Sequence, residues 1–221
     1  QQFDVVLANP PYSIKTWNRE AFEHDRYGRN FLGTPPQDCA DYAFIQHILA
    51  SLDEDNGRCA ILLPHGVLFR SFEKPMREEL IKSDLIESII GIGPNLFYNS
   101  PMEACILICN KRKPNLLKKK ILFINALKEI TRKNGESYLE KEHIKKIASA
   151  FHHAKDIDSF SKVVDLSDIE ANDYDLTIQK YVFINDYVVE LSESFDTYLG
   201  MWDVQSRSTS KELSNLIGLL Q

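Results

Sequence analysis

The stretch Phe3-Asp4-Val5-Val6-Leu7-Ala8-Asn9-Pro10-Pro11-Tyr12 decides how this chain is expected to fold. Its first six residues form a short, mostly apolar run that two consecutive prolines stop. Such a run predicts a buried parallel strand, because proline cannot continue the ladder of backbone hydrogen bonds. Asn9 would then lie at the carboxyl end of the strand, which is where open α/β sheets place their ligand crevice.

The four residues Asn9, Pro10, Pro11 and Tyr12 suit chemistry at a weakly nucleophilic amine. An exocyclic amine conjugated to a ring reacts poorly until its lone pair is localised. The Asn9 side-chain oxygen and the Pro10 carbonyl could each accept one of its N–H bonds. Pro11 would help to fix that backbone, and Tyr12 would stack on a base taken out of a nucleic-acid helix. The alternative is that Asn-Pro-Pro only terminates a strand and that Tyr12 belongs to the core.

Strands and helices alternate after this stretch. We expect helices at 38–53 and 73–82, and strands at 58–63, 85–92, 104–110 and 121–125. This alternation predicts a parallel α/β sheet. Only about eleven residues without a helical pattern join strands 85–92 and 104–110, so these two should form an antiparallel hairpin at the sheet edge. Residues 137–140 resemble a capping box that opens a further helix, with Ile144, Ile147, Ala148 and Phe151 on its inner face.

Composition and charge limit the possible partners. The 221 residues are 43% hydrophobic and carry a formal net charge of −6. A net negative charge does not favour binding to DNA phosphates, so another subunit would have to bind any DNA substrate. The four cysteines lack the spacing of a metal site, and we expect no bound metal. Reduced thiols in the core and a cytoplasmic location are expected instead.

Further landmarks follow the first stretch in a fixed order. They are Gly33-Thr34-Pro35-Pro36, the run at 40–45 (ADYAFI), the run at 64–70 (PHGVLFR), Asn95-Leu96-Phe97-Tyr98 and the run at 172–176 (NDYDL). With them, residues 3–183 resemble the catalytic part of the modification (methyltransferase) subunit of type I restriction–modification systems, a family of N6-adenine DNA methyltransferases. The resemblance implies the C-terminal half of a Rossmann-like sheet, mostly parallel with one antiparallel hairpin strand, and a small helical C-terminal appendage.

The resemblance also implies a reaction, a site and partners. The reaction is transfer of a methyl group from S-adenosylmethionine to a flipped adenine in DNA. Asn9, Pro10, Pro11 and Tyr12 would form the catalytic adenine pocket, and Phe97 or Tyr98 would pack on the base as a substrate-binding residue. DNA, a specificity subunit and a restriction subunit would be the partners.

The binding site for the methyl donor is the part of the family's catalytic domain for which this sequence offers the fewest residues. In the family, a Gly-rich loop upstream of the NPPY residues holds S-adenosylmethionine. Gly91-Ile92-Gly93 is the only G-x-G in the sequence, and it opens a hairpin loop and not a helix, so we reject it as that loop. We therefore expect donor binding to be mostly missing from this chain, which should be inactive alone.

The resemblance divides the chain into three segments. Residues 1–126 would be the C-terminal part of the catalytic domain, 127–184 an α/β extension of it, and 185–221 a helix-prone tail. The NPPY strand should form an open edge of the sheet, followed in order by strands 58–63, 104–110 and 85–92. An unpaired edge beside apolar side chains favours self-association.

Two other functions stay open at this stage. One is a non-catalytic assembly module that contacts a DNA-specificity subunit. The other is a methyltransferase that uses the same NPPY residues on a protein or RNA amide.

Overall fold

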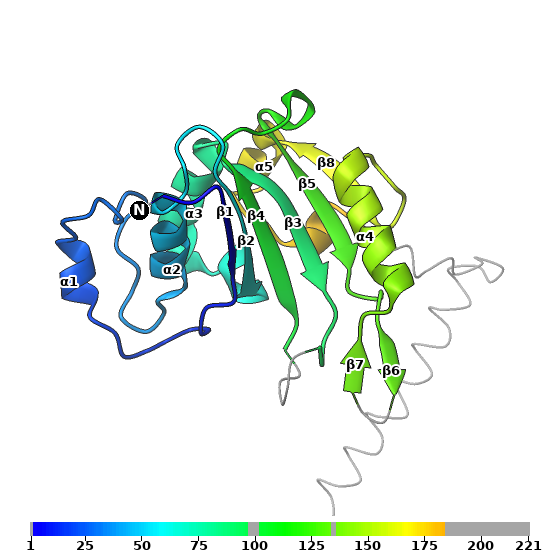
Figure 1. Cartoon of the computed structure of the whole chain (residues 1–221), viewed down its shortest axis with the longest axis horizontal. Coiled ribbons are helices and arrows are strands. Elements are labelled where there is room, and N and C mark those ends of the chain that lie inside the picture. Colours follow the sequence, from blue (N-terminus) through cyan, green and yellow to red (C-terminus); the bar gives the residue numbers. More distant parts are fainter. Residues whose placement is uncertain (1, 97–101, 134–135, 184–221) are drawn as a thin grey trace, which may run out of the picture. The chain divides into compact units, whose positions relative to one another are not determined.

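A mixed β-sheet organises the computed structural model, which describes residues 2–96, 102–133 and 136–183 (Figure 1). In the described part, the strands of this sheet are β1 (Val5–Ala8), β2 (Arg58–Pro64), β3 (Ile86–Ile92), β4 (Ala104–Asn110), β5 (Lys120–Ala126) and β8 (Ser161–Asp165). Strands β6 (Thr131–Lys133) and β7 (Glu136–Tyr138) form a separate ribbon. The helices are α1 (Arg19–Glu23), α2 (Asp41–Ala50), α3 (Lys74–Lys82), α4 (Lys141–His153) and α5 (Leu166–Ala171).

The spatial order of the strands is β1-β2-β4-β3-β5-β8. Strand β1 pairs in parallel with β2, and β3 pairs in parallel with β5. Strand β4 runs antiparallel between β2 and β3, and β8 runs antiparallel to β5. The predicted α/β fold, the β3–β4 hairpin and the order from β1 to β3 are therefore confirmed.

The predicted position of the hairpin at the sheet edge is wrong. Strands β5 and β8 continue the sheet beyond β3. The physical reason is the apolar composition of β5, in which every residue after Lys120 is buried. A strand buried along its length needs neighbours and covering layers on both faces. Strand β8, which was not predicted from the sequence, supplies the outer neighbour, and its Lys162 and Asp165 are exposed.

Helices cover the two faces of the sheet unequally. Helices α2 and α3 pack on one face, where Ile45, Leu49 and Leu80 join Ile61 and Leu107 in the main core. Helix α4 lies on the other face against β5, and a smaller core forms around its Ala150 (Figure 1). On that second face the side chains of β1 are exposed, with Leu7 at 79% and Val5 at 50%.

The predicted start of α4 is also wrong. Ser137 belongs to β7, where its N–H donates to the Asn95 carbonyl at 3.2 Å, so it cannot cap a helix. The capping box forms three residues later, with Glu140 as N-cap and His143 as its partner. Ile144 does not face inward as expected but is 52% exposed.

The described residues through 183 belong to one unit that ends at Ile184. The proposed division at residues 126 and 184 stays a prediction, and the predicted tail at 185–221 lies outside the described residues. Within the ranges given above, no helix combines the length and the apolar composition needed to span a membrane.

Helix α4 ends on a strained residue, which gives a test of the fold. Ala154 caps the helix in the left-handed conformation, with φ of 44°. This conformation costs an L residue free energy that glycine does not lose. We expect Ala154→Gly to raise the free energy of unfolding by about 0.5–1 kcal/mol, measured by urea denaturation.

The matched control is Ala148→Gly, which lies inside the same helix. There glycine gains nothing from its conformational freedom, and the free energy of unfolding should fall by about 1 kcal/mol. Loss of stability in both variants would show that the left-handed cap is not strained.

Candidate active site

The predicted catalytic residues Asn9, Pro10, Pro11 and Tyr12 follow β1 without interruption. Ala8 pairs with Ile61 of the parallel strand β2, so the loops after both strands leave the same edge of the sheet. The second of these loops begins at His65. Asn9 therefore lies at the carboxyl end of a parallel strand, as predicted.

Asn9 is exposed, whereas Pro10 directly after it is buried. No described residue forms a hydrogen bond with the Asn9 side-chain amide, so its oxygen can accept one from a ligand. Burial of Pro10 and its restricted φ fix the backbone beside that amide. This pairing of an accessible acceptor with a fixed backbone suits recognition of an amine.

The hydroxyl end of the Tyr12 side chain is buried. The hydroxyl is buried without a hydrogen-bond partner among the described residues, and the side chain as a whole is half-buried. Burial raises the pKa of Tyr12 to about 12, and the nearby Cys105 and Asp41 add to the effect. The phenol is therefore neutral at pH 7, and the exposed part of its ring can meet a flat ligand.

A largely buried polar cluster adjoins the NPPY residues and was not predicted from the sequence. It consists of Ser13, Cys39, Asp41, Arg70 and Glu73. The signal was present in the sequence, because all five lie in or beside the family landmarks. Separations of up to 60 positions hid their proximity.

Three members of this cluster have the donor types of a metal site. The Cys39 sulfur and carboxylate oxygens of Asp41 and Glu73 lie within 4.8 Å of one another. However, Arg70 Nη1 is already 2.8 Å from Asp41 Oδ2, 3.0 Å from Cys39 Sγ and 3.4 Å from Glu73 Oε2. The guanidinium thus supplies the positive charge at the place where a metal ion would bind.

Burial sets the protonation of the cluster. It raises the pKa of the Cys39 thiol to about 12, so the thiol stays protonated and its single proton can be donated to either Asp41 or Glu73. Burial also raises the pKa of Glu73, against the lowering effect of Cys39 and Arg70. For Arg70, burial lowers the pKa, but the hydrogen bond to Asp41 and the nearby Glu73 charge outweigh it and raise the pKa.

His65 lies at the end of β2, close to the same sheet edge. Its Nδ1 is 3.5 Å from Glu103 Oε2, and its Nε2 is buried without a partner among the described residues. Burial lowers the pKa of His65 more than Glu103 raises it. The ring is therefore neutral at pH 7.

The predicted substrate-binding residues Phe97 and Tyr98 lie outside the described residues. The structure describes the base of their loop. There Asn95 has a positive φ of 59°, and its carbonyl accepts a hydrogen bond from Ser137 of β7. The ribbon β6–β7 thus fixes one side of the loop that should carry both aromatic residues.

The glycines of the described hairpin do not fit a methyl-donor loop. A Cβ at Gly93 would lie 2.5 Å from the Leu127 carbonyl, and a Cβ at Gly91 would lie 2.8 Å from Ile178 Cδ1. Both glycines accommodate close packing of this chain on itself, not the approach of a ligand. Both glycines are therefore explained by packing within the described part of the chain.

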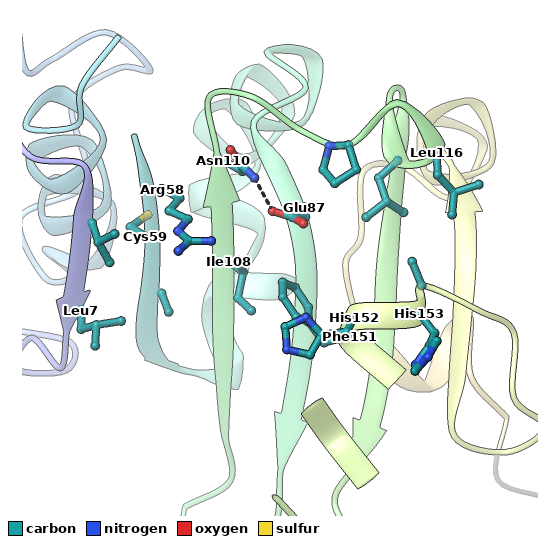
Figure 2. Close-up of a pocket in the computed structure, with 15 residues that line it drawn as sticks. Leu7, Arg58, Cys59, Glu87, Ile108, Asn110, Leu116, Phe151, His152 and His153 are labelled. Carbon is teal, nitrogen blue, oxygen red and sulfur yellow. Dashed lines mark hydrogen bonds between the residues drawn. The ribbon is translucent and has the colours of Figure 1, made fainter. Parts of the chain in front are cut away.

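An open groove of about 500 Å³ lies on the sheet face opposite α2 and α3 (Figure 2). Leu7, Ile108 and Leu116 line it, together with the end of α4. Its polar lining includes Asn110, which donates a hydrogen bond of 2.8 Å to Glu87, as Figure 2 marks. Asn110 ends the antiparallel strand β4, so this part lies at the end of the sheet away from Asn9. None of the predicted catalytic residues Asn9, Pro10, Pro11 and Tyr12 lines this groove.

Comparison with known proteins agrees with this geometry. The methylase subunit of the type I restriction enzyme MjaVIII from Methanocaldococcus jannaschii is 37% identical over 206 residues, covering 87% of this chain and 34% of that protein. The methylase subunit of the type I restriction enzyme HindI from Haemophilus influenzae is 31% identical over 195 residues, covering 82% of this chain and 42% of that protein.

The fold has a solved counterpart. The methyltransferase subunit of a type I restriction–modification system from Streptococcus thermophilus matches with a TM-score of 0.75 and 37% identity, over 82% of this chain and 38% of that one. The chain spans about a third of the length of the curated relatives from M. jannaschii. The family model described as N-6 DNA Methylase matches residues 1–188. The chain belongs to the N-6 DNA methylase family.

Proposed function

We propose that this chain forms the target-base part of a DNA adenine-N6 methyltransferase, within the methylase subunit of a type I restriction–modification system. The observation that carries the proposal is the exposed Asn9 amide beside the buried Pro10, at the carboxyl end of β1. Membership of the N-6 DNA methylase family supports the choice of adenine in DNA over a protein or RNA amide.

The proposed chemistry of this chain is activation of the adenine amine. The Asn9 side-chain oxygen and the Pro10 carbonyl accept its two N–H bonds. These hydrogen bonds localise the nitrogen lone pair and strengthen as positive charge develops on the nitrogen. Tyr12 stacks on the flipped base and keeps water from the amine. Phe97 or Tyr98 would cover the base from the hairpin loop.

The partners follow from the same proposal. DNA is the substrate, and a specificity subunit grips it, since the net charge of −6 does not favour strong DNA binding by this chain alone. A restriction subunit would complete the system. The four free cysteines are buried, which suits the reducing cytoplasm.

Asn9→Ala tests the role of the amide in the complete enzyme. Loss of one of two acceptors should lower kcat by about 10²–10³-fold, by analogy with loss of one donor from an oxyanion hole. The KM for DNA should change little. The control Asn115→Ala, at an exposed position in a short helical turn, should keep full activity. Near-normal methylation by Asn9→Ala would contradict the assignment.

Tyr12 offers a matched pair of variants. Tyr12→Ala removes the stacking face and should weaken capture of the flipped base by about 1–3 kcal/mol, measured with 2-aminopurine fluorescence at the target position. Tyr12→Phe removes only the unpartnered hydroxyl, so activity should persist and stability should not fall. Equal losses in both variants would assign the function to the hydroxyl and not to the ring.

We also propose that the methyl donor is held mainly by residues beyond this chain. The close packing at Gly91 and Gly93 and the chain's share of its relatives support this. Isothermal titration of the chain alone with S-adenosylmethionine should therefore give no micromolar binding. Tight binding by the chain alone would refute the proposal.

The free edge of β1 supports a further association. In the described part, β1 pairs on one side only, with β2, and its Leu7 side chain is exposed. We propose that two copies of the isolated chain pair through this edge, and that the rest of the catalytic domain takes their place in the complete enzyme.

Analytical ultracentrifugation of the isolated chain should then show a dimer that Leu7→Glu dissociates. The control Ile144→Glu changes an aliphatic residue of the same size on α4, which is 52% exposed, and should leave the dimer intact. A monomeric chain, or dissociation by both variants, would exclude the β1 edge.

A further inference from the structure

Ser13, the residue directly after Tyr12, has a positive φ of 48°. An L residue rarely adopts this conformation unless its surroundings hold it there. Both oxygens of the Asp41 carboxylate do so. The Ser13 N–H donates to Oδ1 at 2.7 Å, and the Ser13 hydroxyl donates to Oδ2 at 3.3 Å. Asp41 is 1% exposed, so water does not compete for these bonds.

Arg70, from a different segment of the chain, also contacts Ser13. We refer to Asp41 and Arg70 together as the clamp on Ser13. Its Nη1 donates to Asp41 Oδ2 at 2.8 Å, and its Nη2 donates to the Ser13 hydroxyl oxygen at 3.1 Å. The Arg70 guanidinium therefore contacts both Ser13 and the Asp41 carboxylate that binds Ser13. Its planar donors suit such a paired contact, which a lysine ammonium would not reproduce.

Gly66 determines where the guanidinium lies. A Cβ at this position would lie 2.4 Å from Arg70 Nε and 2.5 Å from its Cζ. Any side chain at 66 would thus push the guanidinium away from Asp41 and Ser13. Because Gly66 belongs to the turn after β2, the clamp joins the ends of β1 and β2 to the start of α2.

We propose that Asp41 and Arg70 are positioning residues of the methyl-transfer site, which act through Ser13. By fixing the backbone after Tyr12, they hold the tyrosine ring and the Pro10 carbonyl in the orientation that a flipped adenine needs. They touch neither the base nor the methyl donor. This inference rests on the proposed function.

The test compares two matched substitutions in the complete enzyme. Asp41→Asn and Asp84→Asn each remove the charge of a carboxylate that pairs with a cation; Asp84 pairs with the buried Lys113 at 2.6 Å, and its own side chain is 28% exposed. Asp84 lies just before β3, at the end of the sheet away from the carboxyl end of β1. Asp41→Asn should lower kcat about 10–100-fold with the KM for DNA within about twofold, because small misplacement of reacting groups costs this much. Asp84→Asn should leave both constants unchanged.

Two further variants isolate the path through Ser13. Gly66→Ala keeps every polar group of the clamp but displaces Arg70, and should lower kcat in the same way as Asp41→Asn. Ser13→Ala combined with Asp41→Asn should be no slower than Asp41→Asn alone, because both changes act on one contact. Effects that multiply would overturn the proposal, as would equal kcat values for Asp41→Asn and Asp84→Asn.

Hydrogen–deuterium exchange separates this inference from the proposed function. The peptide that contains Ser13 should exchange several-fold faster in Asp41→Asn than in wild type, and at the wild-type rate in Asp84→Asn. Unchanged exchange in Asp41→Asn would overturn the positioning role. If the wild type shows this protection but transfers no methyl group to adenine, the proposed function alone fails.

Discussion

The parallel pairing of β1 with β2 is the constraint on which the candidate site depends. It brings the carboxyl ends of both strands to one edge of the sheet, and Pro10 and Pro11 stop β1 there. The loops that leave this edge carry the exposed Asn9, the half-buried Tyr12 and His65. If β1 shifted by one residue along β2, Leu7 would turn into the core and Val6 would turn out of it.

Buried charge near this edge is stable only because its partners converge from distant parts of the sequence. Asp41 and Glu73 are both fully buried, and a lone buried carboxylate would cost several kcal/mol. Arg70 and the Cys39 thiol donate hydrogen bonds to these two carboxylates, and Arg70 also donates one to the Ser13 hydroxyl oxygen. The hydrogen bonds that satisfy these buried polar groups therefore also fix the backbone beside the predicted catalytic residues.

The two faces of the sheet have different roles. The face under α2 and α3 carries the main core and stabilises the fold. The opposite face is covered by α4 only around β5, and the open groove extends across β1, β2 and β4 (Figure 2). Exposed apolar side chains along an unpaired strand edge are unusual in a monomer. The exposed side chains and the free edge of β1 are the observations behind the proposed association through this strand.

The sequence alone determined the local features of this protein. The apolar run before Pro10, the alternating strands and helices and the short β3–β4 connection predicted strands β1 to β5, helices α2 and α3, the β3–β4 hairpin and the place of Asn9, because these depend on neighbouring residues. Only the tertiary structure decided what depends on residues far apart in the chain. It placed β5 and β8 beyond the hairpin, moved the start of α4 by pairing Ser137 with Asn95, and joined Ser13, Asp41 and Arg70. The physical reason is that the spacing of apolar residues indicates only which side of a helix or strand is buried. The hydrogen-bond partners of a buried carboxylate depend on which donors lie next to it in the folded chain.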